Sequence, residues 1–237
     1  MKQFLLPCVL LIFSSAFGQE PLIEEDFESY TVGDYIGVVS NLWTTWSGAT
    51  GTNEDGQVSD EQANSGTQSL KIFGIASGGP MDIYLPLGLD GTAYEVSYNI
   101  YVPSGYSAYM NVQENLSPAV GWAFDIVFSG NGSIQLSIDQ VDIAFGSYNL
   151  DEWTSVSLRM DPVNNLAEIF IGGEYLANIA FDGIIGGVNF FGFGDGSALG
   201  RYYIDDVVVV ETEDVFAVIF GCTDSYSCNY DPSATID

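Results

Sequence analysis

Short runs of β-favouring residues recur along most of the chain, and their spacing is the strongest constraint on its fold. The runs come at intervals of roughly 8 to 14 residues, many alternate apolar with polar positions, and Gly, Asn, Asp, Ser and Pro separate them. No segment shows the period of an amphipathic helix. We therefore predict strands over these ranges: 22–28, 69–74, 81–87, 93–102, 107–114, 122–129, 132–138, 141–146, 153–160, 166–172, 174–180, 188–193 and 201–211.

So many strands bury their apolar sides most simply when two sheets stack. This predicts an all-β fold, a two-sheet antiparallel β-sandwich of the jelly-roll type. Residues 19–213 suffice for one such sandwich and leave no room for a second large domain. The segment 40–68 is rich in Gly, Thr, Ser, Asn and Asp, and we expect a long loop there with space for an irregular strand.

The N-terminus has the order of regions found in an export signal. Lys2 supplies a positive charge, residues 4–13 form an apolar stretch, and Ala16-Phe17-Gly18 is a small-x-small cleavage site, so residues 1–18 are expected to be a signal peptide. The apolar stretch is shorter than the about 20 residues that a membrane-spanning helix needs, and no later segment reaches that length. The mature protein is therefore expected to be secreted or at the cell surface, without membrane insertion.

The chain is strongly acidic, with 32 Asp and Glu against four Lys and Arg and a net charge of −28. Nucleic acid is excluded as a partner, because neutralising phosphates requires Lys and Arg in number. Anionic polysaccharides are disfavoured unless a cation bridges them. Solubility in a salty exterior and charge balance by bound calcium are two further explanations of the acidity.

Alternation along four of the predicted strands separates a buried side from a polar side. The side expected in the core comprises Tyr94, Val96, Tyr98, Ile100, Met110, Val112, Trp122, Phe124, Ile126, Phe128, Ile134, Leu136 and Ile138. The opposite side comprises Glu95, Ser97, Asn99, Tyr101, Tyr109, Asn111, Gln113, Asp125, Ser133, Gln135 and Ser137.

This polar, aromatic-dotted side has two interpretations. One is an ordinary solvated sheet face, since antiparallel sheets commonly expose one side to water. The other is a sugar-binding groove, because sugar rings stack on Tyr or Trp while their hydroxyls pair with amides and carboxylates. The predicted sugar-binding residues are Asn99, Tyr101, Tyr109, Asn111 and Gln113, together with Trp43 and Trp46 in the long loop.

Catalysis is restricted by the absence of histidine, which excludes Ser-His-Asp and Cys-His nucleophile systems and His-ligated zinc or iron. A carboxylate pair remains, and Glu24-Glu25-Asp26-Phe27-Glu28 resembles the E-x-D-x-E strand of family 16 glycoside hydrolases. In that family the motif lies well inside the chain, and an apolar residue usually follows the first Glu. Glu24 and Glu28 would lie about 13 Å apart on a flat strand, whereas a retaining pair needs about 5 Å. We expect no catalytic residues and keep a hydrolase as the less favoured alternative.

Acidic residues also occur on the first and last predicted strands, Asp26 and Glu28 on one and Asp205 and Asp206 on the other. If these strands meet, a calcium ion bound by several oxygens would compensate their charges. The alternative is that each acid is simply exposed to solvent.

Three landmarks occur in order along the chain: Asp26-Phe27-Glu28, the segment Ser65-Gly66-Thr67-Gln68-Ser69-Leu70-Lys71-Ile72, and the ending Tyr202-Tyr203-Ile204-Asp205-Asp206-Val207. Together they resemble the D-F-E, S-G-x-x-S-L-K and Y-I-D-D-V landmarks of jelly-roll carbohydrate-binding modules and concanavalin A-like lectin/glucanase domains. The resemblance implies a structural calcium held by Glu28 and Asp206, with Asp26, Asp205 and the carbonyl of Lys71 as further ligands. In those modules the calcium ligands do not touch sugar.

A second resemblance lies at the C-terminus, where Gly221-Cys222-Thr223-Asp224 and Cys228-Asn229-Tyr230-Asp231-Pro232 resemble a repeat of secreted bacterial surface proteins exported by type IX secretion. The repeat, residues 221–237, stops before its expected third cysteine, so we expect the natural protein to continue beyond Asp237. A Cys222–Cys228 disulfide is one possible pairing in an oxidising exterior. The apolar connector, residues 214–220, is expected to pack on the sandwich edge.

These observations lead to three functional hypotheses. The favoured one is a secreted, non-catalytic, lectin-like carbohydrate-binding module of a larger bacterial surface or extracellular protein, with a polysaccharide or cell-surface glycan as partner. The second is an adhesive or structural surface module that does not bind sugar. The third is a glycoside hydrolase of the family 16 type or a lyase, which requires two carboxylates facing each other across a cleft.

Overall fold

The structure, a computed structural model, describes residues 20–181, 183–193, 198–212 and 227. The predicted signal peptide, the connector 214–220, and Cys222 and Cys228 lie outside the described residues. Within them no helix is long and apolar enough to span a lipid bilayer.

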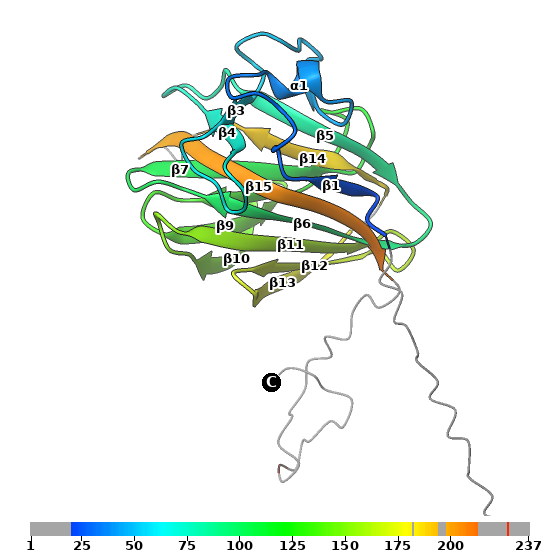
Figure 1. Ribbon diagram of the computed structural model, residues 1–237. Coiled ribbons are helices and arrows are strands. Elements are labelled where there is room, and N and C mark those ends of the chain that lie inside the picture. The colour runs from blue at the N-terminus through cyan, green and yellow to red at the C-terminus, as the bar shows by residue number, and fades with distance from the viewer. Residues whose placement is uncertain (1–19, 182, 194–197, 213–226, 228–237) are drawn as a thin grey trace, which may run out of the picture.

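Strands are the dominant secondary structure of the described residues (Figure 1). All thirteen predicted strands are present, and the segment 40–68 contributes two short ones, β2 and β3. The elements are β1 (Ile23–Glu25), α1 (Ile36–Val39), β2 (Thr44–Thr45), β3 (Gln57–Ser59), β4 (Ser69–Phe73), β5 (Asp82–Leu89), β6 (Ala93–Tyr101), β7 (Tyr106–Gln113), β8 (Trp122–Phe128), β9 (Ser133–Ile138), β10 (Val141–Ser147), β11 (Trp153–Asp161), β12 (Leu166–Ile171), β13 (Glu174–Ala180), β14 (Ile185–Phe191) and β15 (Leu199–Thr212).

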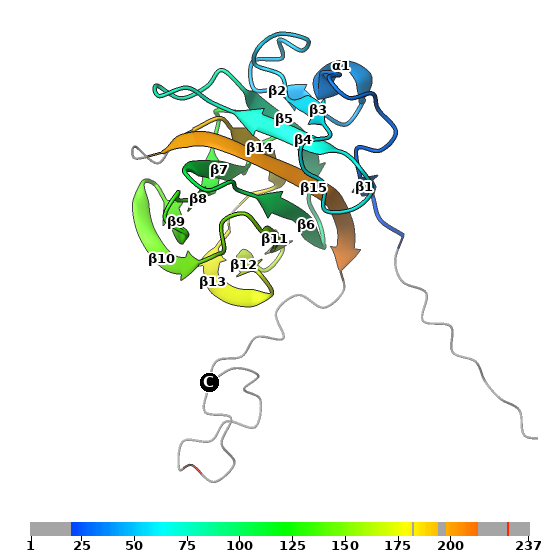
Figure 2. The same cartoon turned by 60° about the vertical axis from the view of Figure 1, so that its left-hand side comes forward.

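The strands form two layers (Figure 2). Sheet A has the order β13-β12-β11-β6-β15, and β15 pairs on its other side with β4 near its start and with β1 further along, while β3 pairs with β4. Sheet B has the order β10-β9-β8-β7-β14-β5-β2. These pairings are antiparallel, and a two-residue parallel pairing of β15 with β7 joins the layers. The predicted two-sheet antiparallel β-sandwich is confirmed.

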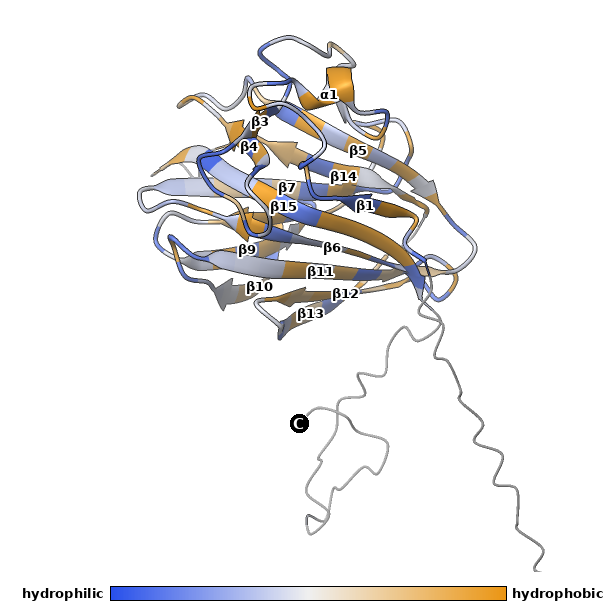
Figure 3. Ribbon diagram, in the orientation of Figure 1, coloured by the Kyte–Doolittle hydropathy of each residue, from blue (hydrophilic) through white to orange (hydrophobic). Residues whose placement is uncertain are grey.

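The core lies between the sheets and follows the two-residue period of the strands. Hydrophobic and hydrophilic segments alternate along many of them (Figure 3). Val96 and Ile100 of sheet A and Met110 and Val112 of sheet B are fully buried, as their alternation predicts. Each strand therefore presents a second, outward set of side chains, and these decide what the two outer surfaces can bind.

One prediction about these outer surfaces is wrong. The polar sides of residues 93–102 and 107–114 were expected to share a single face, but β6 belongs to sheet A and β7 to sheet B. Residues 102–105 carry the chain across the sandwich from one layer to the other. The two polar sides therefore lie on opposite surfaces of the molecule, because outward directions in stacked sheets are opposed.

Candidate functional site

A shallow hollow of about 240 Å³ lies on the outer face of sheet B, and we call it the sheet B hollow. Its floor is built by register. Asn111 of β7 pairs with Asn189 of β14, which in turn pairs with Tyr84 of β5. On the strand that flanks β7 at its other edge, Asp125 of β8 also pairs with Asn111. Directly opposed residues share a face, so these four side chains form one row across the sheet. The lining residues are Trp46, Asp82, Tyr109, Asn111, Trp122, Asn189 and Phe191.

Trp122 forms one wall of the hollow, although strict alternation placed it in the core. The β7–β8 register shifts between Val112 and Gln113, so that Val112 faces Phe124 while Gln113 faces Trp122. One extra residue, Ala123, lies between them on β8, and this bulge turns Trp122 to the outer face. The Trp122 side chain is 45% exposed, and the prediction that it is a core residue is wrong.

Trp46 supports Trp122 from the loop that follows β2. The two indole rings are 5.7 Å apart between centroids, and Trp46 also meets the buried ring of Tyr84 edge-on at 6.2 Å. Gly187 makes this possible, since a Cβ there would lie 2.5 Å from the Tyr84 hydroxyl. The tryptophan pair is therefore held on a packed base and presents a preformed aromatic surface.

A second aromatic cluster lies on the other side of the polar row. Tyr109 contacts Phe191 and Phe193 at centroid distances of 6.2 and 5.5 Å, and Phe191 is directly opposite Asp82 in the β14–β5 pairing. The hollow thus has aromatic side chains on two sides of a polar floor.

The floor is one connected hydrogen-bond network. Gln113 Nε2 donates to Asn111 Oδ1 (2.6 Å), Asn111 Nδ2 donates to Asn189 Oδ1 (2.8 Å), and Asn189 Nδ2 donates to Asp82 Oδ1 (2.7 Å). Asn111 Nδ2 also donates to the Tyr109 hydroxyl (3.3 Å), which donates to Asp125 Oδ1 (2.5 Å). Asn111 and Gln113 are only 2% and 0% exposed, so they hold the floor together and are not the solvated side chains that alternation predicted.

Both carboxylates of this network have raised pKa values. Burial raises the pKa of Asp82 to about 7; the hydrogen bond from Asn189 lowers it, and the charge of Glu54 raises it further. Burial likewise raises the pKa of Asp125, against the lowering effect of the Tyr109 hydroxyl. Asp82, which lines the hollow, and Asp125, which lies beside it opposite Asn111, are therefore two partly desolvated carboxyl groups, held in place by an amide and a phenol donor.

The structure divides the predicted sugar-binding residues into three groups. Tyr109, Asn111, Gln113 and Trp46 come together at the sheet B hollow. Asn99 and Tyr101 lie on the outer face of sheet A, where Tyr101 packs against Trp153 and Tyr203.

Trp43, the remaining predicted sugar-binding residue, is 3% exposed in the core. Its ring packs between Phe27 and Phe190 at centroid distances of 6.0 and 6.2 Å, so its predicted place on the rim of a groove is wrong.

Sequence reasoning missed Asp82, Asn189 and Phe191 as parts of the site. Asn189 carried a usable signal, because a buried amide between the apolar residues Val188 and Phe190 must find hydrogen-bond partners. Asp82 carried none, since a single acid at the start of a strand is ordinary. Only the pairing of β14 with β5 and β7 brings these side chains to Asn111.

The acids predicted to bind calcium lie around the loop 64–68 but are occupied by its donors. Asp205 Oδ2 accepts from the backbone N–H of Asn64 (2.7 Å) and of Ser65 (3.2 Å), and Asp206 accepts from the Asn64 amide and the Ser65 hydroxyl (both 2.6 Å). Glu28 accepts from the backbone N–H groups of residues 67 and 68 at 2.7 and 2.6 Å.

The other two predicted ligands are also engaged. Asp26 is exposed and accepts from the N–H of Glu28, and the Lys71 side chain pairs with Glu61 while its backbone lies within sheet A. No three Asp, Glu, Cys or His side chains in the described ranges converge as a metal site. Calcium binding by these residues stays a prediction of the resemblance.

The E-x-D-x-E segment does not extend along one strand. β1 ends at Glu25, whose carboxylate is buried and accepts from Phe27 N (3.0 Å) and the Tyr30 hydroxyl (2.7 Å). Glu24 is exposed, and Phe27 has a left-handed φ of 59° that turns the chain toward the loop 64–68. Glu28 is therefore directed to that loop.

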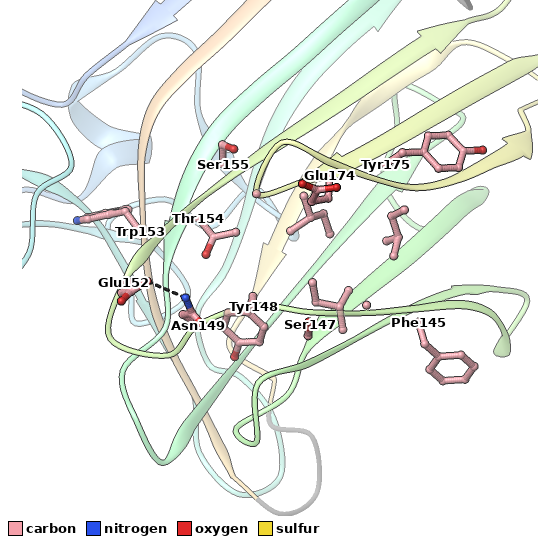
Figure 4. Close-up of a pocket in the computed structure, with 15 residues that line it drawn as sticks. Phe145, Ser147, Tyr148, Asn149, Glu152, Trp153, Thr154, Ser155, Glu174 and Tyr175 are labelled. Carbon is pink, nitrogen blue, oxygen red and sulfur yellow. Dashed lines mark hydrogen bonds between the residues drawn. The ribbon is translucent and has the colours of Figure 1, made fainter. Parts of the chain in front are cut away.

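A larger hollow of about 560 Å³, the edge hollow, lies where the end of β10 approaches the β12–β13 hairpin (Figure 4). Ile134, Ile171 and Leu176 contribute apolar lining, and the rim carries Glu152 and Glu174. Asn149 donates to Glu152 across 2.8 Å, whereas the rings of Phe145 and Tyr175 extend away from the other labelled side chains. The sheet B hollow combines a connected polar floor with aromatic side chains on two sides, and we take it as the candidate site.

No model of a known protein family and no curated protein matches the chain. Solved structures do match. A structure named "Cellulose induced protein, Cip1" aligns over 80% of this chain and 97% of its own, with a TM-score of 0.57 and 14% identity. A structure named "Sialidase" aligns over 76% of this chain, with a TM-score of 0.51 and 9% identity, and this chain covers only 18% of it.

A third structure, named as carbohydrate-binding module CBM66 from Bacillus subtilis, aligns over 72% of this chain and 96% of its own, with a TM-score of 0.45 and 11% identity. Sequence identities this low are evidence of a shared fold alone. What the first two comparisons establish is that this chain has the β-sandwich fold of known proteins.

Proposed function

We propose that this protein is a secreted, non-catalytic carbohydrate-binding module of a larger bacterial surface or extracellular protein, and that a glycan binds in the sheet B hollow. The observation that carries the proposal is the polar floor of Asn111, Asn189 and Asp82 between two aromatic clusters. Sugars combine apolar ring faces with directional hydroxyls, so an aromatic wall beside fixed polar groups matches their chemistry.

Preorganisation supports the same proposal. Trp122 is half-exposed yet packed against Trp46, so a sugar that stacks on it orders little that is not already ordered. The buried amides of the floor are fixed by one another, which keeps Asp82 in place before a ligand arrives.

The experiment is a glycan array, followed by pull-down on insoluble polysaccharides, with wild type and Trp122→Ala. We expect Trp122→Ala to lower affinity by at least about tenfold, as for an aromatic side chain that a ligand covers. Because the ring is half-exposed, the same change should cost less than about 1 kcal/mol of stability.

Phe145→Ala is the matched control, since it removes an aromatic ring that is 67% exposed beside the edge hollow. We expect it to leave glycan binding unchanged. Loss of binding in Phe145→Ala but not in Trp122→Ala would move the site to the edge hollow. If the wild type binds no glycan, the alternative of an adhesive or structural surface module is favoured.

A further inference from the structure

The hydrogen-bond donors on the floor of the sheet B hollow are consumed within the protein. Both hydrogens of the Asn189 amide are used, one on Asp82 Oδ1 (2.7 Å) and one on the carbonyl oxygen of Ile83 (2.9 Å). Both hydrogens of the Asn111 amide are used on Asn189 Oδ1 (2.8 Å) and the Tyr109 hydroxyl (3.3 Å). The Tyr109 hydroxyl in turn gives its hydrogen to Asp125.

This network runs in one direction and ends on carboxylates. It starts at the backbone N–H of Ala119, which donates to Gln113 Oε1 (3.1 Å), and passes through Gln113, Asn111 and Asn189 to Asp82. Each amide uses its oxygen to accept from the preceding group and its nitrogen to donate to the next, so the chain fixes the orientation of all three amides. Gln113 is fully buried and offers no donor to a ligand.

The floor therefore presents acceptors to a ligand. Among the described residues, Asp82 and Asp125 each accept one side-chain hydrogen bond through Oδ1, and the second oxygen of each carboxyl group has no partner there. When these carboxyl groups are ionised, which for Asp82 means at a pH above about 7, a ligand group that meets their oxygens must donate a hydrogen bond. Sugar hydroxyls can do so, whereas a carboxylate or sulfate on the sugar can only accept and adds a like charge.

The basic side chains of the described residues lie away from the hollow, so none of them offsets this preference for uncharged sugars. Lys71, Arg159 and Arg201, the basic residues of the described ranges, all lie on sheet A. Lys71 and Arg201 pair with Glu61, and Arg159 pairs with Glu95. Among the described residues, the outer face of sheet B thus carries acidic side chains and no basic side chain.

We propose that the sheet B hollow selects uncharged glycans, whose hydroxyls donate to Asp82 and Asp125, and rejects glycans that carry carboxylates or sulfates. This proposal rests on the proposed glycan-binding function and adds the chemical class of its ligand. The selection is local to the hollow, so it differs from the general repulsion that the acidity of the whole chain would exert.

The test uses pairs of glycans that differ in charge alone. Suitable pairs are methyl-esterified and free-acid homogalacturonan, cellulose and C6-oxidised cellulose, and lactose and sialyllactose. For each pair of which the protein binds at least one member, we expect the uncharged glycan to bind at least about tenfold more tightly at low salt. This difference in affinity should become smaller at high salt, where charges are screened.

Variants separate the local effect from the charge of the whole chain. Asp125→Asn should make this difference in affinity smaller, whereas Asp60→Asn, which removes an exposed charge on sheet A beyond β3, should leave it unchanged. Equal or tighter binding of the acidic member would overturn the selectivity, and so would an equal effect of the two variants. Failure of every glycan to bind, or indifference of binding to Trp122→Ala, would instead overturn the proposed function.

Discussion

Replacing Asp82 by Asn should stabilise the protein more at alkaline pH than at acidic pH. Asn preserves the shape of the side chain and an oxygen that accepts from Asn189, but it has no charge to desolvate. The pKa of Asp82 is about 7 in the fold against 3.8 as its ordinary value, with burial as the main cause. A carboxyl group whose pKa is raised by folding favours the folded state below its ordinary pKa and loses that contribution as pH rises toward the folded value.

The size of the effect follows from these two pKa values. Ionisation of Asp82 lowers the free energy of unfolding by about 2 kcal/mol at pH 5 and by about 4 kcal/mol at pH 8. The stabilising effect of Asp82→Asn should grow by the difference, about 2 kcal/mol, over this pH range. For a domain of this size, the larger value corresponds to a melting temperature about 10 °C above that of the wild type.

Urea denaturation at pH 5, 6, 7 and 8 provides the assay, with tryptophan fluorescence as the probe. Asp60→Asn, the same substitution at an exposed position, serves as the matched control. Two results would refute the conclusion that the Asp82 carboxyl group is buried with a raised pKa. One is a difference in unfolding free energy between Asp82→Asn and the wild type that stays constant across this pH range. The other is destabilisation by Asp82→Asn at pH 8. The same variant should bind glycan less well, because it replaces an acceptor by a donor.

Two further changes test other parts of the structure. Trp43→Ala should cost about 3 to 5 kcal/mol of unfolding free energy, because it empties a core position between Phe27 and Phe190, and a loss below about 1 kcal/mol in urea denaturation would contradict its burial. Adding EGTA tests the predicted calcium site at Glu28 and Asp206: bound calcium there predicts a fall of several degrees in melting temperature that added calcium reverses, and an unchanged melting temperature would contradict the prediction.

The loop 64–68 surrounds the acids near the first and last strands with hydrogen-bond donors. Asp205 is fully buried, and burial raises its pKa to about 6, while the N–H groups of Asn64 and Ser65 act in the opposite direction. The backbone donors from Thr67 and Gln68 lower the pKa of Glu28. The loop between β3 and β4 therefore supplies hydrogen-bond donors to both sets of acids.

The local pattern of the chain was sufficient to predict its strands and most of their buried sides. The two-residue period assigned Val96 and Ile100 to the core, as well as Met110 and Val112, because side-chain direction in a strand depends on the backbone alone. The same period placed Tyr109 and Asn111 together on an outer face. Composition also predicted the all-β class, since turn residues at short, regular spacing leave little room for helices.

Tertiary structure decided which outer residues form a site. The sequence does not say that β6 and β7 join different sheets, so Asn99 and Tyr101 were grouped with Tyr109 although they lie on the other surface. Trp43 and Trp46 are three residues apart in one segment, yet one enters the core and the other covers Tyr84.

The bulge at Ala123 shows why the sequence of one strand does not determine the site. Considered within β8 alone, Trp122 alternates in step with Phe124 and would be assigned to the core. Pairing with Gln113 of β7 reverses its direction and makes it a wall of the hollow. The period along one strand thus determined the two faces of each strand, whereas the pairing between strands, which depends on residues distant in sequence, decided where the periods are interrupted and which faces meet to form the floor of Asn111, Asn189 and Asp82.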